Sequence, residues 1–182
     1  MSILGENWEF LSEESRINEN ITKFIETSSA VIHSTGLSVV APNGAGKSTY
    51  ARKRRDWVDG DDLLEAVINM GKKTEMSEND MKRADRVTKQ AKEKGLWILT
   101  ATWYDPKLVD IFVVPREEEL KKRLEKKDFP RGFYENNIAP YVKKIIRPLA
   151  EKHNIPIVED FNALDLLVTE NIRATKFGYT IE

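Results

Sequence analysis

The chain has 182 residues, of which 40% are hydrophobic and 32% are charged, a composition typical of one globular domain with a single core. Its 29 basic and 30 acidic residues nearly cancel, so the overall charge predicts no general attraction to nucleic acid or to a membrane surface. The absence of cysteine excludes disulfides, thiolate nucleophiles and cysteine metal sites.

An apolar stripe predicts that residues 8–30 form a helix. The residues of the stripe are Phe10, Leu11, Ile17, Ile21, Phe24 and Ile25. We treat residues 1–35 as a helical extension ahead of the main domain, 36–182. We expect this helix to pack on a sheet or on a partner, either another protein or a second copy of the chain. No apolar run approaches the roughly 18–20 residues that cross a bilayer, so we expect no membrane contact.

The next segments are predicted to be a strand, a loop and a helix. Residues 36–40 are apolar enough for a short buried strand, and residues 48–54 favour a helix. The loop between them, 41–49, has the spacing of a phosphate-binding loop: Gly, four residues, then Gly-Lys-Ser/Thr. Ala41 takes the first position, and its methyl group is acceptable if its φ is negative.

Each residue type in this loop has a physical role in holding phosphate. Small residues let the backbone N–H groups turn inward toward phosphate oxygens. Lys47 would bring a positive charge to the β- and γ-phosphates of ATP, and the Ser48 hydroxyl would bind Mg²⁺. The alternative is an ordinary glycine-rich turn with a solvated lysine. The residues expected to bind the nucleotide are Asn43, Gly44, Ala45, Gly46, Lys47, Ser48 and Thr49.

Carboxylates follow the second predicted strand, 56–59. Because ligands of such α/β sheets bind beyond the carboxyl ends of the strands, Asp59 and Asp61 are predicted to be catalytic. Asp59 would hold Mg²⁺ through water, and Asp61 would accept the proton of an acceptor hydroxyl or orient that hydroxyl. The alternative is a helix cap, for which Asp62 is the preferred residue. The third strand lacks such an acid, which favours transfer to an acceptor over hydrolysis.

Strands and helices alternate along the rest of the chain. Helices are expected at 61–69, 77–94, 116–127, 141–153 and 163–172, with Ser77 as a cap, and further strands at 96–101, 109–114 and 155–158. Residues 176–182 would form an edge strand or a tail. This alternation predicts an α/β fold with a parallel sheet covered by helices on both faces.

The basic stretch 121–132 is predicted to form part of a lid. A mobile segment that brings Arg123 or Arg131 to the transferring phosphoryl group would exclude water and neutralise charge. Residues 126–137 are rich in residues typical of turns, so we expect them to move without ligand and to close when donor and acceptor are bound. The alternative is a solvated helix with Glu–Lys pairs.

The phosphate-binding loop, Asp-Gly-Asp at 59–61 and the segment 114–124 together resemble the P-loop kinases of small molecules. This group includes nucleoside monophosphate, shikimate, gluconate and adenylylsulfate kinases, and the resemblance covers roughly residues 36–172. It implies a P-loop NTPase three-layer sandwich with a five-stranded parallel sheet in the order 2-3-1-4-5 and a small lid at about 121–137. It also implies that Arg123 lies against the adenine and phosphates of ATP. The second lid arginine of the family falls on Lys127, which cannot offer the same planar fork.

The acceptor is the least defined part of the predicted reaction. Arg83 and Arg86 are candidates for an acceptor phosphate, and Trp103 and Tyr104 for stacking on an acceptor base, although surface and core roles are the alternatives. We expect a cytoplasmic, Mg²⁺-dependent phosphotransferase that moves the γ-phosphate of ATP to a small acceptor, a nucleotide or nucleoside.

Two other functions stay open. One is a polynucleotide 5′-hydroxyl kinase, for which residues 121–131 with Lys143, Lys144 and Arg147 would supply a basic groove; the near-neutral charge makes nucleic acid the less favoured partner. The other is a nucleotide-binding structural or regulatory subunit with little catalysis, which the departures from the family pattern at Ala41 and Lys127 would fit.

Overall fold

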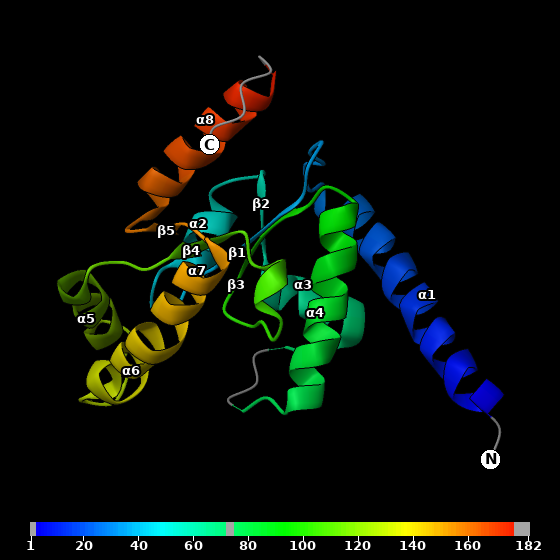
Figure 1. The fold of residues 1–182 in the computed structure, drawn as a ribbon, viewed down its shortest axis with the longest axis horizontal. Coiled ribbons are helices and arrows are strands. Elements are labelled where there is room, and N and C mark those ends of the chain that lie inside the picture. Colours follow the sequence, from blue (N-terminus) through cyan, green and yellow to red (C-terminus); the bar gives the residue numbers. More distant parts are fainter. Residues whose placement is uncertain (1–2, 72–74, 177–182) are drawn as a thin grey trace. The chain divides into compact units, whose positions relative to one another are not determined.

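The computed structural model describes residues 3–71 and 75–176, with side chains described for 12–71 and 75–172. It is an α/β fold with a five-stranded parallel sheet in the order β2–β3–β1–β4–β5 (Figure 1), as predicted. The strands are β1 (Leu37–Val40), β2 (Trp57–Asp59), β3 (Trp97–Thr100), β4 (Ile111–Val113) and β5 (Ile157–Val158). The chain forms two compact units, the first containing the described residues up to Val40 with 46–110, and the second 41–45 with the described residues from 111 onward.

The first unit is built on three parallel strands, in which β3 pairs with both β1 and β2. All residues of β3 are buried, which is why its sequence is apolar without alternation. Its helices are α1 (Ile3–Ser28), α2 (Lys47–Arg52), α3 (Gly60–Ile68) and α4 (Glu78–Glu93), followed by the short 3₁₀ turn η1 (Pro106–Leu108). Ser77 caps α4 through a capping box with Asp80, as its sequence predicts.

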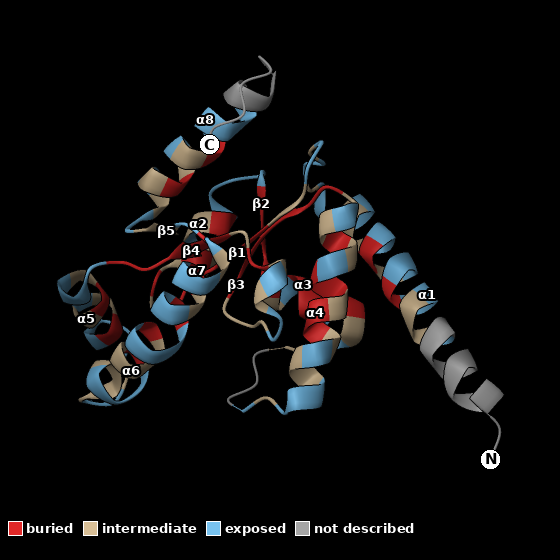
Figure 2. Cartoon of the chain, viewed as in Figure 1, coloured by how far each residue is buried: buried red, intermediate tan, exposed pale blue. Residues whose placement is uncertain are grey.

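The predicted N-terminal helix forms and contributes to the core of the first unit. Ile17 and Ile21 are fully buried, and they pack in one cluster with residues of α3, α4, β2 and β3. Figure 2 shows buried positions in red along α1, α3 and α4. The other members of this cluster are Val58, Leu63, Leu64, Val67, Met70, Ala84, Val87, Ala91, Leu96 and Ile98. Burial of Ile17 and Ile21 stabilises the unit by about 1.5–3 kcal/mol per side chain.

Aromatic rings form a second cluster at β2 and β3. His33 stacks on Trp97 with ring centroids 3.5 Å apart and planes within 5°. Trp97 in turn contacts Trp57 at 5.2 Å, and its indole N–H donates to the Thr35 carbonyl at 2.9 Å. The residues before β1 are therefore tied directly to β3, and through Trp97 to β2.

In the second unit, β4 pairs with β5 in parallel, and helices supply the rest of the structure. These are α5 (Glu117–Glu125), η2 (Tyr134–Ile138), α6 (Ala139–Tyr141), η3 (Val142–Ile146), α7 (Arg147–His153) and α8 (Phe161–Lys176). The segment predicted to follow Lys176 as a strand or tail lies, from 177 onward, outside the described residues. None of the helices in the described ranges has the length and apolar composition that a bilayer span needs.

One helix boundary in this unit was predicted wrongly. The sequence predicted turns up to residue 137 and a helix from 141, but helical structure begins at Tyr134. The stretches η2 and η3 are wide π-helical turns, and each is followed two residues later by a proline, Pro140 and Pro148. A proline has no N–H to donate and clashes with the carbonyl four residues earlier, so the helix continues only by widening.

Candidate functional site

The loop 41–49 connects the buried end of β1 to the start of α2. Gly44 and Gly46 have φ values of 84° and 96°, a conformation that glycine adopts without strain. Ala41 is fully buried and is not among the described residues with positive φ, so the condition set for alanine at this position is met. The Ala45 N–H donates to the Pro42 carbonyl at 3.2 Å, which closes a turn within the loop.

The polar residues at the end of this loop have different exposures. Lys47 is the first residue of α2 and is only 8% exposed, although lysine is rarely this buried. Ser48 is half-buried, while Asn43 and Thr49 are exposed. The loop therefore places Lys47 inside the structure. The following residue, Ser48, has a half-buried hydroxyl group.

Asp59 lies at the carboxyl end of β2 and is 7% exposed. Its Oδ1 accepts a hydrogen bond from the Asp61 N–H at 3.0 Å, so Asp59 is the cap of α3. The choice of Asp62 as the cap was wrong, because the helix begins at Gly60 and its first free N–H groups face the residue before it. Asp61 is half-buried and Asp62 is exposed.

In the second unit, the side chain of Arg123 contacts the backbone of the loop. Its guanidinium donates to the Ala45 carbonyl and to the Glu119 carboxylate one turn earlier on α5. A Cβ on Gly44 would come within 2.7 Å of the Leu124 side chain. Because α5 packs so closely on residues 44 and 45, glycine is needed at position 44 for space as well as for its φ.

The segment that follows α5 carries the other predicted lid residues. Lys127 and Arg131 are exposed, and Asp128 and Gly132 have positive φ, so the predicted turns between 126 and 133 are present. Motion of the segment stays a prediction.

The far end of this segment is attached to α5. Lys121 on α5 forms ion pairs with Glu117 and Glu135, each at 2.8 Å. The hydrogen bonds to these two carboxylates raise the pKa of Lys121. Lys143, Lys144 and Arg147, which were predicted to join a basic groove, are exposed on η3 and α7.

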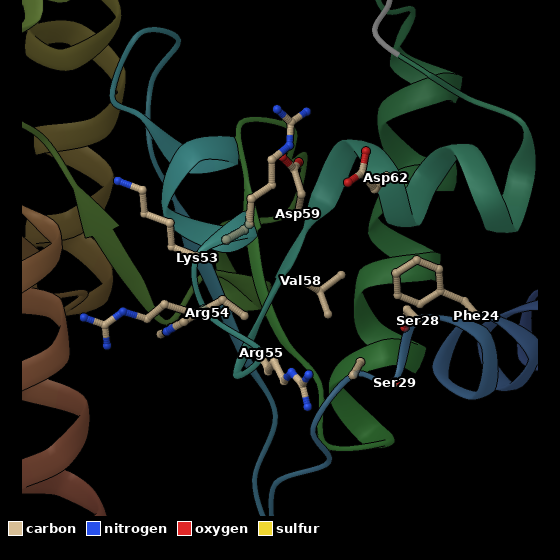
Figure 3. A pocket seen from close by; sticks show the side chains of 13 residues that line it. Phe24, Ser28, Ser29, Lys53, Arg54, Arg55, Val58, Asp59 and Asp62 are labelled. Atoms are coloured by element: carbon tan, nitrogen blue, oxygen red, sulfur yellow. The ribbon is translucent and has the colours of Figure 1, made fainter.

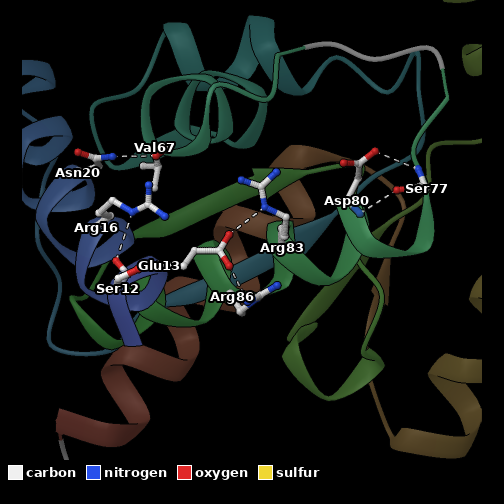
Figure 4. A network of polar contacts seen from close by, with 9 residues as sticks. All are labelled: Ser12, Glu13, Arg16, Asn20, Val67, Ser77, Asp80, Arg83 and Arg86. Atoms are coloured by element: carbon white, nitrogen blue, oxygen red, sulfur yellow. Dashed lines mark hydrogen bonds and ion pairs between the residues drawn. The ribbon is translucent and has the colours of Figure 1, made fainter. Parts of the chain in front are cut away.

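Arg83 and Arg86, the candidates for an acceptor phosphate, are already paired with an internal carboxylate (Figure 4). The two oxygens of Glu13 accept from Arg83 Nε at 2.9 Å and from Arg86 Nη1 at 3.0 Å. Glu13 lies on α1. On the same helix, the Asn20 side-chain amide donates a hydrogen bond to the Val67 carbonyl of α3 at 2.9 Å. These arginines are therefore part of the contact between α1 and α4.

The loop after β3 is held by a buried acid. Asp85 accepts from the N–H groups of Tyr104 at 3.0 Å and Asp105 at 2.7 Å. Burial raises the pKa of Asp85, and these two hydrogen bonds oppose the rise. The Tyr104 hydroxyl donates to Glu78 at 2.9 Å and Lys82 lies over its ring, so Tyr104 is anchored on α4, and Trp103 beside it is half-buried.

A cavity of about 420 Å³ in the first unit was not predicted from the sequence (Figure 3). It is lined by the end of α1, by the end of α2 and the turn after it, by β2 and by Asp62. The available signal was the run of four basic residues, Arg52–Arg55, directly before β2. The lining residues are Phe24, Ser28, Ser29, Ala30, Ala51, Arg52, Lys53, Arg54, Arg55, Trp57, Val58, Asp59 and Asp62.

Comparison with known proteins adds no identification: no protein-family model, curated protein or solved structure matches the chain. Within the residues that the structure describes, no three acidic or histidine side chains converge as the ligands of a metal ion.

Proposed function

We propose that the protein is an ATP-dependent phosphotransferase. The observation that carries the proposal is the loop 41–49, which joins a parallel strand to a helix, has two glycines at positive φ and ends in a lysine that is 8% exposed. A buried lysine in this context supports a role in charge neutralisation more than a role in solubility. The parallel sheet in the order 2-3-1-4-5 is the strand order that the resemblance to P-loop kinases implies.

The donor would be held by the loop. Backbone N–H groups of residues 43–46 and the Lys47 ammonium would bind the β- and γ-phosphates. Ser48 and Asp59 are the residues that fit Mg²⁺, since this ion prefers oxygen ligands and is commonly held by one or two protein groups together with substrate phosphates. The ion would supply neutralisation of the charge that develops on the phosphate oxygens.

The reaction would be an in-line transfer. The hydroxyl oxygen of the acceptor forms a bond to the γ-phosphorus, the bond from that phosphorus to the β–γ bridging oxygen breaks, and ADP leaves with the bond electrons. Asp61, at the first turn of α3, accepts the proton of the hydroxyl, while Asp59 fixes this turn through its hydrogen bond to the Asp61 N–H. Arg123 supports the loop through the Ala45 carbonyl, and Arg131 would approach from the exposed segment.

Lys47→Ala tests this function. We expect phosphotransfer from γ-labelled ATP to a mixture of nucleosides, nucleoside monophosphates and 5′-hydroxyl oligonucleotides to fall by about a thousandfold or more, because the main positive charge on the transferring group is removed. The matched control is Lys89→Ala, an exposed lysine on α4. Urea unfolding of both variants separates an effect on the chemistry from an effect on folding.

Unchanged transfer in Lys47→Ala would contradict the proposal. Tight binding of ATP to the wild-type chain without transfer to any acceptor would instead favour the structural or regulatory subunit. The two results are distinguished by measuring ATP binding in the same samples.

A further inference from the structure

The Arg123 guanidinium forms two hydrogen bonds inside the second unit. Its Nη1 donates to the Ala45 carbonyl in the loop, and its Nη2 donates to the Glu119 carboxylate one turn earlier on α5. The side chain of Arg123 is 34% exposed, so both bonds are partly shielded from water, and the second joins two charged groups. Arg123 is therefore part of the support of the loop.

The bond to the Ala45 carbonyl also fixes the direction of the next N–H group. No cis peptide bond occurs among the described residues, and in a planar trans peptide the C=O and the N–H point in opposite directions. Because the Ala45 C=O is directed to Arg123, the Gly46 N–H is directed away from it. Gly46 is half-buried, and among the described residues its N–H has no hydrogen-bond acceptor. Such an N–H is a donor that a ligand can use.

Glycine at position 46 would allow this peptide group two orientations. The φ of Gly46 is 96°, and glycine adopts positive and negative φ with similar ease. The peptide group between Ala45 and Gly46 could therefore rotate and exchange the directions of its C=O and N–H. The hydrogen bond from the Ala45 N–H to the Pro42 carbonyl at 3.2 Å holds only the preceding peptide group. The hydrogen bond of Arg123 selects one of the two orientations.

Helix α5 holds the loop at a second point, through apolar side chains. Leu120 and Leu124 are almost fully buried, and Leu124 packs so close to Gly44 that a Cβ there would lie 2.7 Å from it. Residues one turn apart on a helix are neighbours on its surface, so the Leu120–Leu124 and Glu119–Arg123 pairs form adjacent rows. The apolar row sets the distance of α5 from the loop, and the polar row sets the direction of the peptide group.

We propose that Glu119 and Arg123 are positioning residues for the phosphates of the nucleotide donor. Arg123 holds the peptide group after Ala45 with its carbonyl toward α5, which leaves the Gly46 N–H available to a phosphate oxygen, and Glu119 holds the guanidinium in place. Arg123 then acts through the loop and makes no contact with the nucleotide. This role differs from the contact with adenine and phosphates that the resemblance to small-molecule kinases implies. The inference rests on the proposed function, since it concerns the loop that would bind ATP.

Loss of Glu119 separates positioning from direct contact, because the two roles predict effects of opposite sign. If Arg123 contacted phosphate, the Glu119 carboxylate would compete with phosphate for the guanidinium, and its removal would strengthen binding. If Arg123 positions the loop, removal of Glu119 lets the guanidinium leave the Ala45 carbonyl, and binding weakens. Glu118→Ala removes the same charge from an exposed neighbouring position of α5, so it measures the general effect of charge.

The test measures binding of ATP and of inorganic tripolyphosphate, which has no adenine, to the full chain by isothermal titration calorimetry. We expect Arg123→Met to bind both probes about tenfold more weakly, because each loses the same oriented donor. Glu119→Ala should bind both about threefold more weakly than Glu118→Ala does. Arg123→Lys, which keeps a donor for the Ala45 carbonyl, should recover part of the affinity. Urea unfolding identifies any variant that has lost its fold, and the remaining variants then decide.

Steady-state transfer from ATP adds a second readout. A group that acts only on binding of the donor changes KM more than kcat, so the loss in Arg123→Met should appear mainly in the KM for ATP. A group that contacts the transferring phosphoryl would instead lower kcat.

Three results would each overturn the inference and assign Arg123 to direct contact with the nucleotide. These are stronger binding in Glu119→Ala than in Glu118→Ala, a decrease for ATP without one for tripolyphosphate, and a loss confined to kcat. Binding and transfer that neither substitution changes would remove the positioning role and leave the proposed function. Tripolyphosphate binding that depends on Arg123 and Glu119, in a wild-type chain that transfers phosphate to no acceptor, would leave the positioning role and remove the proposed function.

Discussion

Two pairs of arginines in the first unit have opposite environments. Arg83 and Arg86 on α4 share the carboxylate of Glu13, whereas Arg52 and Arg55 beside β2 form no ion pair among the described residues. Glu13 lies 70 residues before Arg83 in the chain. The role of a basic cluster is therefore set by the acidic group that the fold brings to it, which local sequence does not show.

The two environments imply different consequences for stability. The paired arginines should contribute to folding, and the unpaired arginines should contribute little to it. Three measurements test this difference between the two pairs.

The largest effect is expected for Glu13→Lys. This change removes two ion pairs and places a third cation between Arg83 and Arg86, so the free energy of unfolding should fall by about 2 kcal/mol. Urea unfolding gives the value. Glu26→Lys, the same charge change at an exposed position of the same helix, is the control, and an equal decrease in both variants would show that the pairing of Glu13 has no special weight.

A smaller effect is expected in a double-mutant cycle between Glu13→Gln and Arg86→Gln. The coupling free energy should be about 0.5–1 kcal/mol in low salt and close to zero in 1 M NaCl, because these groups are partly exposed and screened. The cycle of Glu19→Gln with Lys23→Gln, an exposed pair on α1, should give a smaller coupling. A salt-independent coupling at Glu13 would mean that packing accounts for the interaction.

The smallest effect on stability is expected for Arg52→Gln/Arg55→Gln. Since no ion pair is removed, the free energy of unfolding should stay within about 0.5 kcal/mol of the wild type, with any change toward greater stability as repulsion is relieved. Thermal unfolding measures this. A decrease in the free energy of unfolding of about 1 kcal/mol or more lies well outside the usual range of surface substitutions. It would show that Arg52 and Arg55 stabilise the fold, as Arg83 and Arg86 are expected to do.

The elements of the fold could be predicted because their signals are local. The strands at β1 and β3 are continuous apolar runs, the Ser77 capping box marks the start of α4, and the spacing of 41–49 marks a loop between strand and helix. The errors also have local causes. Asn136 and Asn137 have turn preferences, but the Asn136 N–H donates to the Gly132 carbonyl and the helix continues through them.

The environment of the candidate site could be predicted less well because it depends on contacts between distant residues. The burial of Lys47 and the contact of Arg123 with Ala45 follow from packing, and the residue types alone do not fix them. The cavity beside β2 needs the end of α1, which was predicted to be a separate extension. The position of Asp59 after its strand was predictable, but its role as the cap of α3 depends on where the helix begins.

The ring cluster of His33, Trp97 and Trp57 also gives the protein an internal optical reporter. Trp57 lines the cavity beside β2 and lies against Trp97, which His33 covers at 3.5 Å. Indole emission depends on the polarity and the motion of its surroundings, so a ligand that enters the cavity changes the emission of this pair without any added dye. Among the tryptophans whose side chains the structure describes, Trp57 alone is among the cavity-lining residues, and replacing it with Phe identifies the signal.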